Sequence, residues 1–189
     1  MTNLHPLALN SHLIPTPLGD MLAIAGEDGI VFLDFQTREN FDGEVQRLKA
    51  RLALQGQTAT IVAASHPHLE SLRAELAEYF AADRRHFTVP VAPHGTNFEL
   101  RAWRFLQTIP YGQTRSYGQQ AGALGAPNAA RAVGRANGAN FIGILIPCHR
   151  VIGAGGSLTG YGGGIDRKRW LLDHERKVVG AQHPALALG

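Results

Sequence analysis

The sequence predicts an α/β (α+β) fold of two domains: a small N-terminal β-sheet and helix domain, then a mostly helical C-terminal domain. Two apolar runs around a glycine-bounded turn favour an early β-hairpin, and apolar residues at helical spacing follow. The charge balance changes midway: residues 1–95 carry 7 Lys and Arg against 11 Asp and Glu, and residues 96–189 carry 11 against 4. We therefore expect domains over 1–92 and 93–178 and a flexible tail over 179–189.

The N-terminal half is expected to be a small scaffold. Apolar runs at Met21–Ala25 and Ile30–Phe35, separated by Gly26–Gly29, predict the hairpin. Helical spacing predicts two helices, the first carrying Phe41, Val45, Leu48 and Leu52 and the second Leu69, Leu72, Leu76, Tyr79 and Phe80. A short strand is expected at Phe87–Val91, and no motif that carries chemistry stands out before residue 92.

Two capping boxes predict the first helices of the C-terminal half. Thr96 with Glu99 opens a helix that ends at Pro110–Gly112. Ser116 with Gln119 repeats the pattern for a shorter helix, which runs to about residue 124.

A third helix completes a pattern typical of a helix-turn-helix. Pro127 suits its first position, and it is expected through Asn128–Ala136. Arg131 and Arg135 lie four residues apart among alanines and Gly134, so the helix can approach another surface closely and the arginines can reach phosphates or enter a groove. The basic C-terminal half also suits a polyanionic partner. Alternatively, the alanines pack against neighbouring helices and the arginines are solvated.

The composition excludes several classes of protein. Cys148 is the single cysteine of 189 residues, which excludes an internal disulfide framework and a multi-cysteine zinc site. No run of 18 apolar residues and no secretory signal is present, so we expect a soluble, cytoplasmic protein. The histidines show no convincing ligand spacing and we expect no metal; those considered are His5, His66, His68, His86 and His94.

Cys148 has an unusual setting. It follows a strand-like apolar run, Phe141–Ile146, and Pro147, and glycine-rich segments come after it. A lone buried cysteine is usually inert, and a free thiol is mostly protonated at neutral pH. His149 is a candidate base, although contact between the two neighbours requires a turn at this point.

The segment from Ile146 to Ile152 resembles the active-site motif of the 6-O-methylguanine-DNA methyltransferases, of the stand-alone bacterial type. The resemblance covers about residues 95–176 and includes Gly95-Thr96, Phe98, Trp103, Ile109-Pro110-Tyr111-Gly112, Ser116-Tyr117, Ala130-Arg131-Ala132-Val133-Gly134, Asn137, Asn140, Gly160-Tyr161, Trp170-Leu171-Leu172 and His174-Glu175. It implies a ribonuclease H-like N-terminal domain and a winged-helix-like C-terminal domain. With one cysteine, the zinc-binding regulatory domain of some members is excluded.

The resemblance implies a role for each catalytic position. Cys148 is the nucleophile that takes the alkyl group. His149 draws the thiol proton through a water molecule, and Glu175 orients the histidine. Asn140 braces the active-site turn, and Tyr117 meets the flipped base and helps to protonate the departing guanine.

It also implies a DNA-binding surface and a pocket. Arg131 resembles the arginine finger that fills the gap left by the flipped nucleotide, and the remaining DNA-binding positions are Arg135, Ser116, Ala130 and Gly134. The pocket positions are Pro147, Val151, Tyr161, Gly162 and Gly163. Because relatives often place a larger residue at Gly162, we expect room here for alkyl groups larger than methyl.

The expected function is repair of double-stranded DNA by direct damage reversal. The alkyl group of 6-O-alkylguanine, and of 4-O-alkylthymine, passes irreversibly to Cys148 after the base is flipped through the minor groove. The thioether has no good leaving group, so each molecule acts once, as a monomer and without a cofactor.

Three other interpretations explain fewer residues. A non-catalytic lesion binder lacks the acceptor cysteine, a helix-turn-helix regulator leaves the Cys-His-Glu set unused, and a cysteine hydrolase leaves the DNA-binding positions unused. The lesion range, the preference for guanine or thymine, cooperativity on DNA and any further role of the N-terminal domain stay open.

Overall fold

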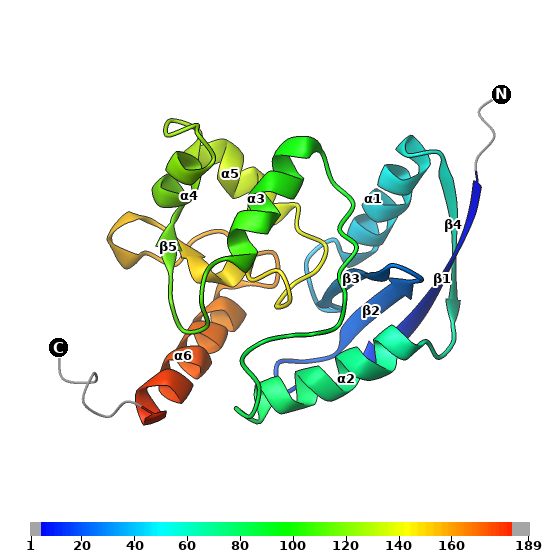
Figure 1. Cartoon of the computed structure of the whole chain (residues 1–189), viewed down its shortest axis with the longest axis horizontal. Helices are drawn as coiled ribbons and strands as arrows, with labels where there is room; N and C mark the ends of the chain where they lie inside the picture. The colour runs from blue at the N-terminus through cyan, green and yellow to red at the C-terminus, as the bar shows by residue number, and fades with distance from the viewer. Residues whose placement is uncertain (1–4, 183–189) are drawn as a thin grey trace.

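The computed structural model describes residues 5–182 and shows a mixed sheet beside a helical unit (Figure 1). The N-terminal unit contains β1 (His5–Ile14), β2 (Met21–Gly26), β3 (Gly29–Phe35), α1 (Phe41–Leu54), β4 (Gln57–Ala63) and α2 (Pro67–Phe80). The C-terminal unit contains α3 (Asn97–Gln107), β5 (Arg115–Ser116), α4 (Tyr117–Ala123), α5 (Ala130–Gly138), the 3-10 turns η1 (Cys148–Arg150) and η2 (Ala154–Gly156), β6 (Val151–Ile152) and α6 (Ile165–Gln182). The two-domain α+β prediction is confirmed.

The four-stranded sheet has the order β3-β2-β1-β4. Strand β2 is antiparallel to β1 and β3, which confirms the predicted hairpin, whereas β1 and β4 run parallel. Strands β1 and β4 escape the sequence pattern because both are exposed along much of their length. Both N-terminal helices lie where the apolar spacing predicts them.

The strand expected at Phe87–Val91 is wrong, apart from one isolated bridge at Val91. The N–H groups of Thr88 and Val89 donate to the Glu75 carboxylate instead of to a neighbouring strand. Pro90 has no N–H to donate. A side chain of α2 therefore satisfies the backbone of this segment.

Both capping boxes are confirmed. The Thr96 hydroxyl accepts from the Glu99 N–H and the Glu99 carboxylate accepts from the Thr96 N–H, and Ser116 and Gln119 do the same at α4. The start predicted for the third helix is wrong. Pro127 and Asn128 lie in a turn, and α5 begins at residue 130 and continues to 138.

Buried polar contacts join α3, α4 and α5. Gln120 and Asn137 exchange side-chain hydrogen bonds of 3.1 and 2.7 Å, and Gln120 also donates to the Ala102 carbonyl at 3.1 Å. Trp103 Nε1 donates to the Ala136 carbonyl at 2.8 Å. These contacts fix α5 against the two preceding helices.

The run Phe141–Ile146 is a turn rather than the expected strand. Leu33 of β3 donates to the Phe141 carbonyl and accepts from the Gly143 N–H, both at 2.8 Å. Ile144 has a φ of 67°, a conformation incompatible with a strand. The free edge of β3 therefore holds the segment that leads to the cysteine.

The two units share one continuous hydrophobic core, which includes Phe32 from the sheet and Trp103 and Ile146 from the helical unit. Helix α6 continues through residues 179–182 of the segment expected as a tail, and 183–189 lie outside the described residues. Within residues 5–182, no helix is long and apolar enough to cross a membrane.

Candidate active site

Cys148 begins the turn η1, which supplies the bend that contact between Cys148 and His149 requires. Its N–H donates to the Ile146 carbonyl at 2.8 Å, and its side chain is partly buried. The same turn directs the adjacent His149 into the protein, where it is fully buried.

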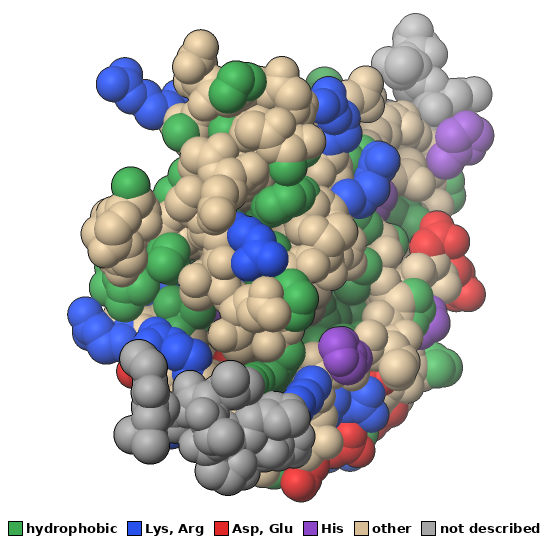
Figure 2. All heavy atoms as spheres, turned by 60° about the vertical axis from the view of Figure 1, so that its left-hand side comes forward, with side chains coloured by type: hydrophobic (Ala, Val, Ile, Leu, Met, Phe, Trp, Pro, Cys, Tyr) green, Lys and Arg blue, Asp and Glu red, His purple; other side chains and the backbone are tan. Residues whose placement is uncertain are grey.

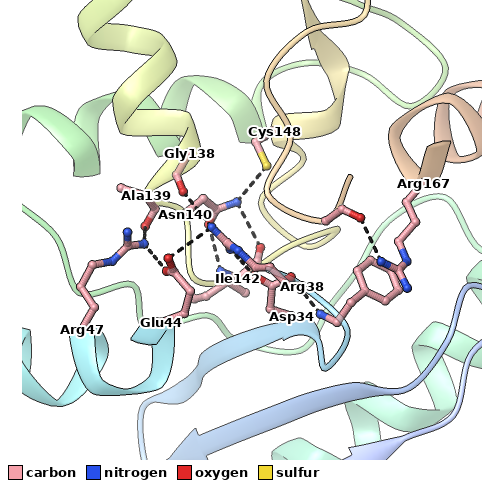
Figure 3. Close-up of polar contacts among 12 residues, drawn as sticks. Asp34, Arg38, Glu44, Arg47, Gly138, Ala139, Asn140, Ile142, Cys148 and Arg167 are labelled. Carbon is pink, nitrogen blue, oxygen red and sulfur yellow. Dashed lines mark hydrogen bonds and ion pairs between the residues drawn. The ribbon is translucent and has the colours of Figure 1, made fainter. Parts of the chain in front are cut away.

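Asn140 braces this turn (Figure 3). Its Nδ2 donates to the Ile146 carbonyl at 2.9 Å and to Cys148 Sγ at 3.4 Å, and its Oδ1 accepts from the Ile142 N–H at 3.0 Å. Burial raises the pKa of the Cys148 thiol, and the Asn140 hydrogen bond opposes this rise only in part. The resting group is therefore a thiol, and it needs a base to become a nucleophile.

Glu175 on α6 is the centre of a buried hydrogen-bond cluster. Its carboxylate accepts from His149 Nε2 at 2.9 Å, from Tyr79 Oη at 3.0 Å and from the Gly112 N–H at 2.9 Å. Arg150 donates to it through Nε and Nη2, both at 2.9 Å. Burial raises the pKa of Glu175, but His149 and Arg150 outweigh this and hold it below its ordinary value. Glu175 is therefore a carboxylate.

His149 is oriented as a base. Because the Glu175 carboxylate accepts hydrogen bonds, Nε2 carries the proton and Nδ1 keeps its lone pair. Nδ1 is buried and has no hydrogen-bond partner in the described part of the chain. Burial lowers the pKa of His149, so the ring is neutral at neutral pH and can accept a proton at Nδ1.

Three residues that donate hydrogen bonds to the Glu175 carboxylate are not among the site residues predicted from the sequence. Arg150 lies two residues after Cys148, and this position in the motif is the only feature of the sequence that points to a role in the site. Gly112 has a φ of 74°, which explains the glycine after Pro110 and Tyr111. Tyr79 comes from α2 of the N-terminal unit, 96 residues away in sequence, and no local pattern indicates its role.

Lys168 is a further missed residue. Its side chain is buried, and Nζ donates to the carbonyls of Val151 at 2.6 Å and Thr159 at 2.7 Å. It thus links α6 to the segments on both sides of η2. A signal existed in the sequence, because the buried positions of α6 recur at helical spacing: Lys168, Leu171, Leu172, Glu175 and Val178.

The expected pocket residues separate into two groups. Tyr161, Gly162 and Gly163 line a small cavity together with Cys148, to which Arg38 and Asp34 of the N-terminal unit also contribute. Pro147 and Val151 are buried and do not line this cavity.

The room expected at Gly162 is not open. A Cβ placed there would lie 2.6 Å from Arg38 Cζ, so the guanidinium occupies the space that the missing side chain leaves. No pattern in the sequence indicates Arg38, which lies in a turn of the other domain.

Tyr117 begins α4, and its hydroxyl donates to the carbonyls of Thr159 at 3.1 Å and Gly160 at 3.2 Å. Gly134 of α5 lies beside the Tyr117 ring, where an added Cβ would make an ordinary van der Waals contact at 3.7 Å. Tyr117 therefore lies between the helix-turn-helix and the glycine-rich loop.

Helices α4 and α5 and the turn between them form the helix-turn-helix. It borders an open groove lined by Tyr117, Ala130, Arg131, Gly134, Arg135, Thr159 and Gly160. Arg131 and Arg135 are exposed and make no ion pair within residues 5–182. The Ser116 side chain is occupied in capping α4. In Figure 2 Lys and Arg side chains are spread over the face that comes forward, and Asp and Glu lie mostly toward its right and lower edges.

Fold and site together define a cysteine-centred protein in which a buried His-Glu pair and a basic helix-turn-helix lie in one C-terminal unit. Two family models match the chain: the 6-O-methylguanine DNA methyltransferase ribonuclease-like domain at residues 9–93, and the DNA binding domain of the same family at residues 97–177. The chain belongs to the 6-O-methylguanine DNA methyltransferase family.

Individual proteins agree with this assignment. A methylated-DNA–protein-cysteine methyltransferase of Mycolicibacterium paratuberculosis is 59% identical over 103 residues, which are 54% of this chain and 62% of that protein. The Shigella flexneri protein of the same name is 44% identical over 170 residues, 89% of this chain and 96% of its own. A crystal structure of Mycobacterium tuberculosis OGT in complex with DNA has a TM-score of 0.70 and 40% identity, covering 91% of this chain and 94% of that one.

Proposed function

We propose that the protein repairs alkylated DNA by transferring the alkyl group from 6-O-alkylguanine, and from 4-O-alkylthymine, to Cys148. The observation that carries the proposal is that His149 shares the turn η1 with Cys148, contacts Glu175 through Nε2, and keeps a buried Nδ1 without a partner within residues 5–182. Family membership and the DNA-bound structure of a similar protein support it.

The thiol is activated by proton transfer. The Sγ proton moves to His149 Nδ1 through a water molecule, and the resulting imidazolium is stabilised by the Glu175 carboxylate. The buried Arg150 keeps that carboxylate ionised and fixed in position. The Asn140 amide and the charge of Lys168 stabilise the thiolate as it forms.

The thiolate then displaces guanine from the alkyl carbon. A carbon–sulfur bond forms, the bond between that carbon and the guanine oxygen breaks, and its electron pair stays on the base. Tyr117 is proposed to supply a proton to the departing guanine, exchanging its contact with the Gly160 carbonyl for one with the base. The product is a thioether without a good leaving group, so each molecule acts once.

The base has to leave the duplex before it can react, at a cost of a few kcal/mol. We propose that Arg131 fills the space left by the flipped nucleotide while α5 lies in the minor groove. Arg135, Ser116, Ala130 and Gly134 are proposed to contact the backbone there. The exposed guanidinium of Arg131 and the small residues around it support this role.

The proposed setting is the cytoplasm, where reducing conditions keep the acceptor as a thiol. The proposed working units are the N-terminal domain over 1–92 and the DNA-binding and acceptor domain over 93–178.

A mass measurement tests the proposal. After incubation with duplex DNA containing O6-methylguanine, the peptide with Cys148 should gain one methyl group. Cys148→Ser should gain none and should keep its affinity for the duplex. A wild-type peptide of unchanged mass, or a methyl group found on another residue, would refute the transfer.

A second variant tests the DNA contact. Arg131→Ala should slow transfer from the duplex by about tenfold or more, equivalent to about 1.4 kcal/mol of lost support for flipping. Transfer from the free base O6-benzylguanine, which needs no flipping, should not change. Equal losses with both substrates would argue against the role of Arg131.

A further inference from the structure

The cavity beside Cys148 is too small for the base that the proposed function requires. It is lined by Cys148 and Asn140, by Gly162 and Gly163, and by Asp34 and Arg38 of the N-terminal domain. Only about 10 Å³ is open to the centre of a water molecule. This is room for about one water, so a purine with its alkyl group cannot enter unless a side chain leaves.

The guanidinium of Arg38 fills this space. A Cβ added to Gly162 would lie 2.6 Å from Arg38 Cζ and 2.7 and 2.9 Å from its two terminal nitrogens. The guanidinium therefore lies against the Gly162 backbone. Figure 3 shows Arg38 reaching between Asp34 and the segment that carries Asn140.

Arg38 is held in this position by acceptors on three sides. It forms an ion pair with Asp34, lies 3.4 Å from Glu44 Oε1 and donates to the Gly138 carbonyl at 3.3 Å. Only 10% of its side chain is exposed. Its backbone lies in the turn between β3 and α1, outside the regular elements, so the side chain can move without disturbing the sheet.

We propose that Arg38 is a specificity-determining residue of the base pocket: its guanidinium occupies the place of the flipped base, and every substrate has to displace it from Gly162. The inference rests on the proposed function. Displacing Arg38 breaks the same contacts with Asp34, Glu44 and Gly138 for every lesion. The pocket therefore favours substrates that gain binding energy from contacts elsewhere on the protein. Duplex DNA does so through the helix-turn-helix, whereas a free base does not.

Binding of a free base tests occupancy apart from transfer. In protein carrying Cys148→Ser, which cannot be alkylated, the Kd for O6-benzylguanine should fall about tenfold when Arg38→Ala is added. Arg38→Lys keeps the charge on a narrower group, so its Kd for O6-benzylguanine should lie between the Kd with Arg38 and the Kd with Arg38→Ala. Arg47→Ala is the matched control, because Arg47 contacts Glu44 and donates to the Ala139 carbonyl but does not line the cavity.

Transfer rates give the second readout. Arg38 also lowers the pKa of Cys148, so its removal slows any reaction of the thiol. Iodoacetamide is a small thiol reagent, so its rate reports only the lower reactivity of the Cys148 thiol. With Cys148 present, the rate with O6-benzylguanine divided by the rate with iodoacetamide should rise about tenfold in Arg38→Ala and stay constant in Arg47→Ala.

The outcomes separate the two proposals. An unchanged Kd and rate ratio in Arg38→Ala, or equal changes in Arg47→Ala, would overturn the role of Arg38. Absence of O6-benzylguanine binding in every variant would overturn it as well. If the Kd falls as expected but the wild type takes no alkyl group from duplex DNA, the pocket assignment holds and the proposed repair function fails.

Discussion

Tyr79 donates a hydrogen bond to Glu175 at 3.0 Å across the boundary between the two domains. Both side chains are fully buried, and Glu175 is the residue that orients His149. The N-terminal domain therefore contributes directly to the hydrogen bonds behind the proposed base.

Replacement of Tyr79 by Phe should shift the pH dependence of alkyl transfer. Without the hydroxyl, the Glu175 carboxylate is less stabilised and attracts the His149 proton more strongly, so the pKa of His149 rises. The acidic limb of the rate profile should therefore move to higher pH. Tyr111→Phe is the control, since the Tyr111 hydroxyl has no partner within residues 5–182. Identical profiles for Tyr79→Phe and wild type would contradict this prediction.

Glu99 should make the protein sensitive to acid. Its carboxylate accepts from Arg51 of α1 at 2.8 Å, and this contact lowers its pKa to about 2. A depressed carboxyl pKa stabilises the fold above the unfolded value, and this contribution is lost as the pH falls from about 4.5 to about 2. Glu99→Gln should lose about 1–2 kcal/mol at pH 7, allowing for solvent screening.

Urea unfolding at pH 7 and pH 3 measures this effect. The difference in the free energy of unfolding between wild type and Glu99→Gln should be smaller at pH 3 than at pH 7. Glu70→Gln is the control, because Glu70 and Arg73 form an exposed pair at 3.5 Å. A difference that stays constant between the two pH values would count against the assignment.

Lys168 should make the free energy of unfolding rise with pH in the alkaline range, as Glu99 does in the acidic range. Burial lowers its pKa to about 8, against 10.5 for an ordinary lysine. Between these values the unfolded chain binds more protons than the folded protein, so this lysine makes the free energy of unfolding rise with pH. The rise should be absent in Lys168→Met and present in Lys177→Met, which alters an exposed lysine of the same helix. Parallel curves for wild type and Lys168→Met would disprove the prediction.

The buried amides of Gln120 and Asn137 should not contribute additively to the free energy of unfolding. Asn137→Leu leaves Gln120 Oε1 without its donor, at a cost of about 1–3 kcal/mol, while Gln120 Nε2 keeps the Ala102 carbonyl. Adding Gln120→Leu removes the unsatisfied group, so the double variant should be more stable than that single variant. Thermal unfolding measures both, and additive losses would rule out the coupling.

The sequence predicts local features well where one segment contains all the relevant residues. The two capping boxes and the first hairpin depend on residues a few positions apart, and all are confirmed. The strand expected at Phe87–Val91 is wrong because its backbone partner is the Glu75 side chain, which no local pattern reveals.

The site residues also divide into those that one segment of sequence predicts and those that depend on distant segments. The positions of Cys148 and His149 in one turn are local, and the motif that carries them is distinctive. Tyr79 and Arg38 reach the site only because the N-terminal domain packs beside it, so they require the tertiary structure. Lys168 is intermediate, since its place on the buried face of α6 follows from helical spacing but its charge favours the solvent.

The pairing of β3 with residues 141–143 has a thermodynamic consequence. Backbone hydrogen bonds from Leu33 and one unbroken core join the halves, so neither half can lose its structure and leave the other intact. Two domains by sequence are thus one cooperative unit: calorimetry should show a single transition, with equal calorimetric and van't Hoff enthalpies. Cutting the chain near residue 93 would yield fragments that each expose half of a common interior.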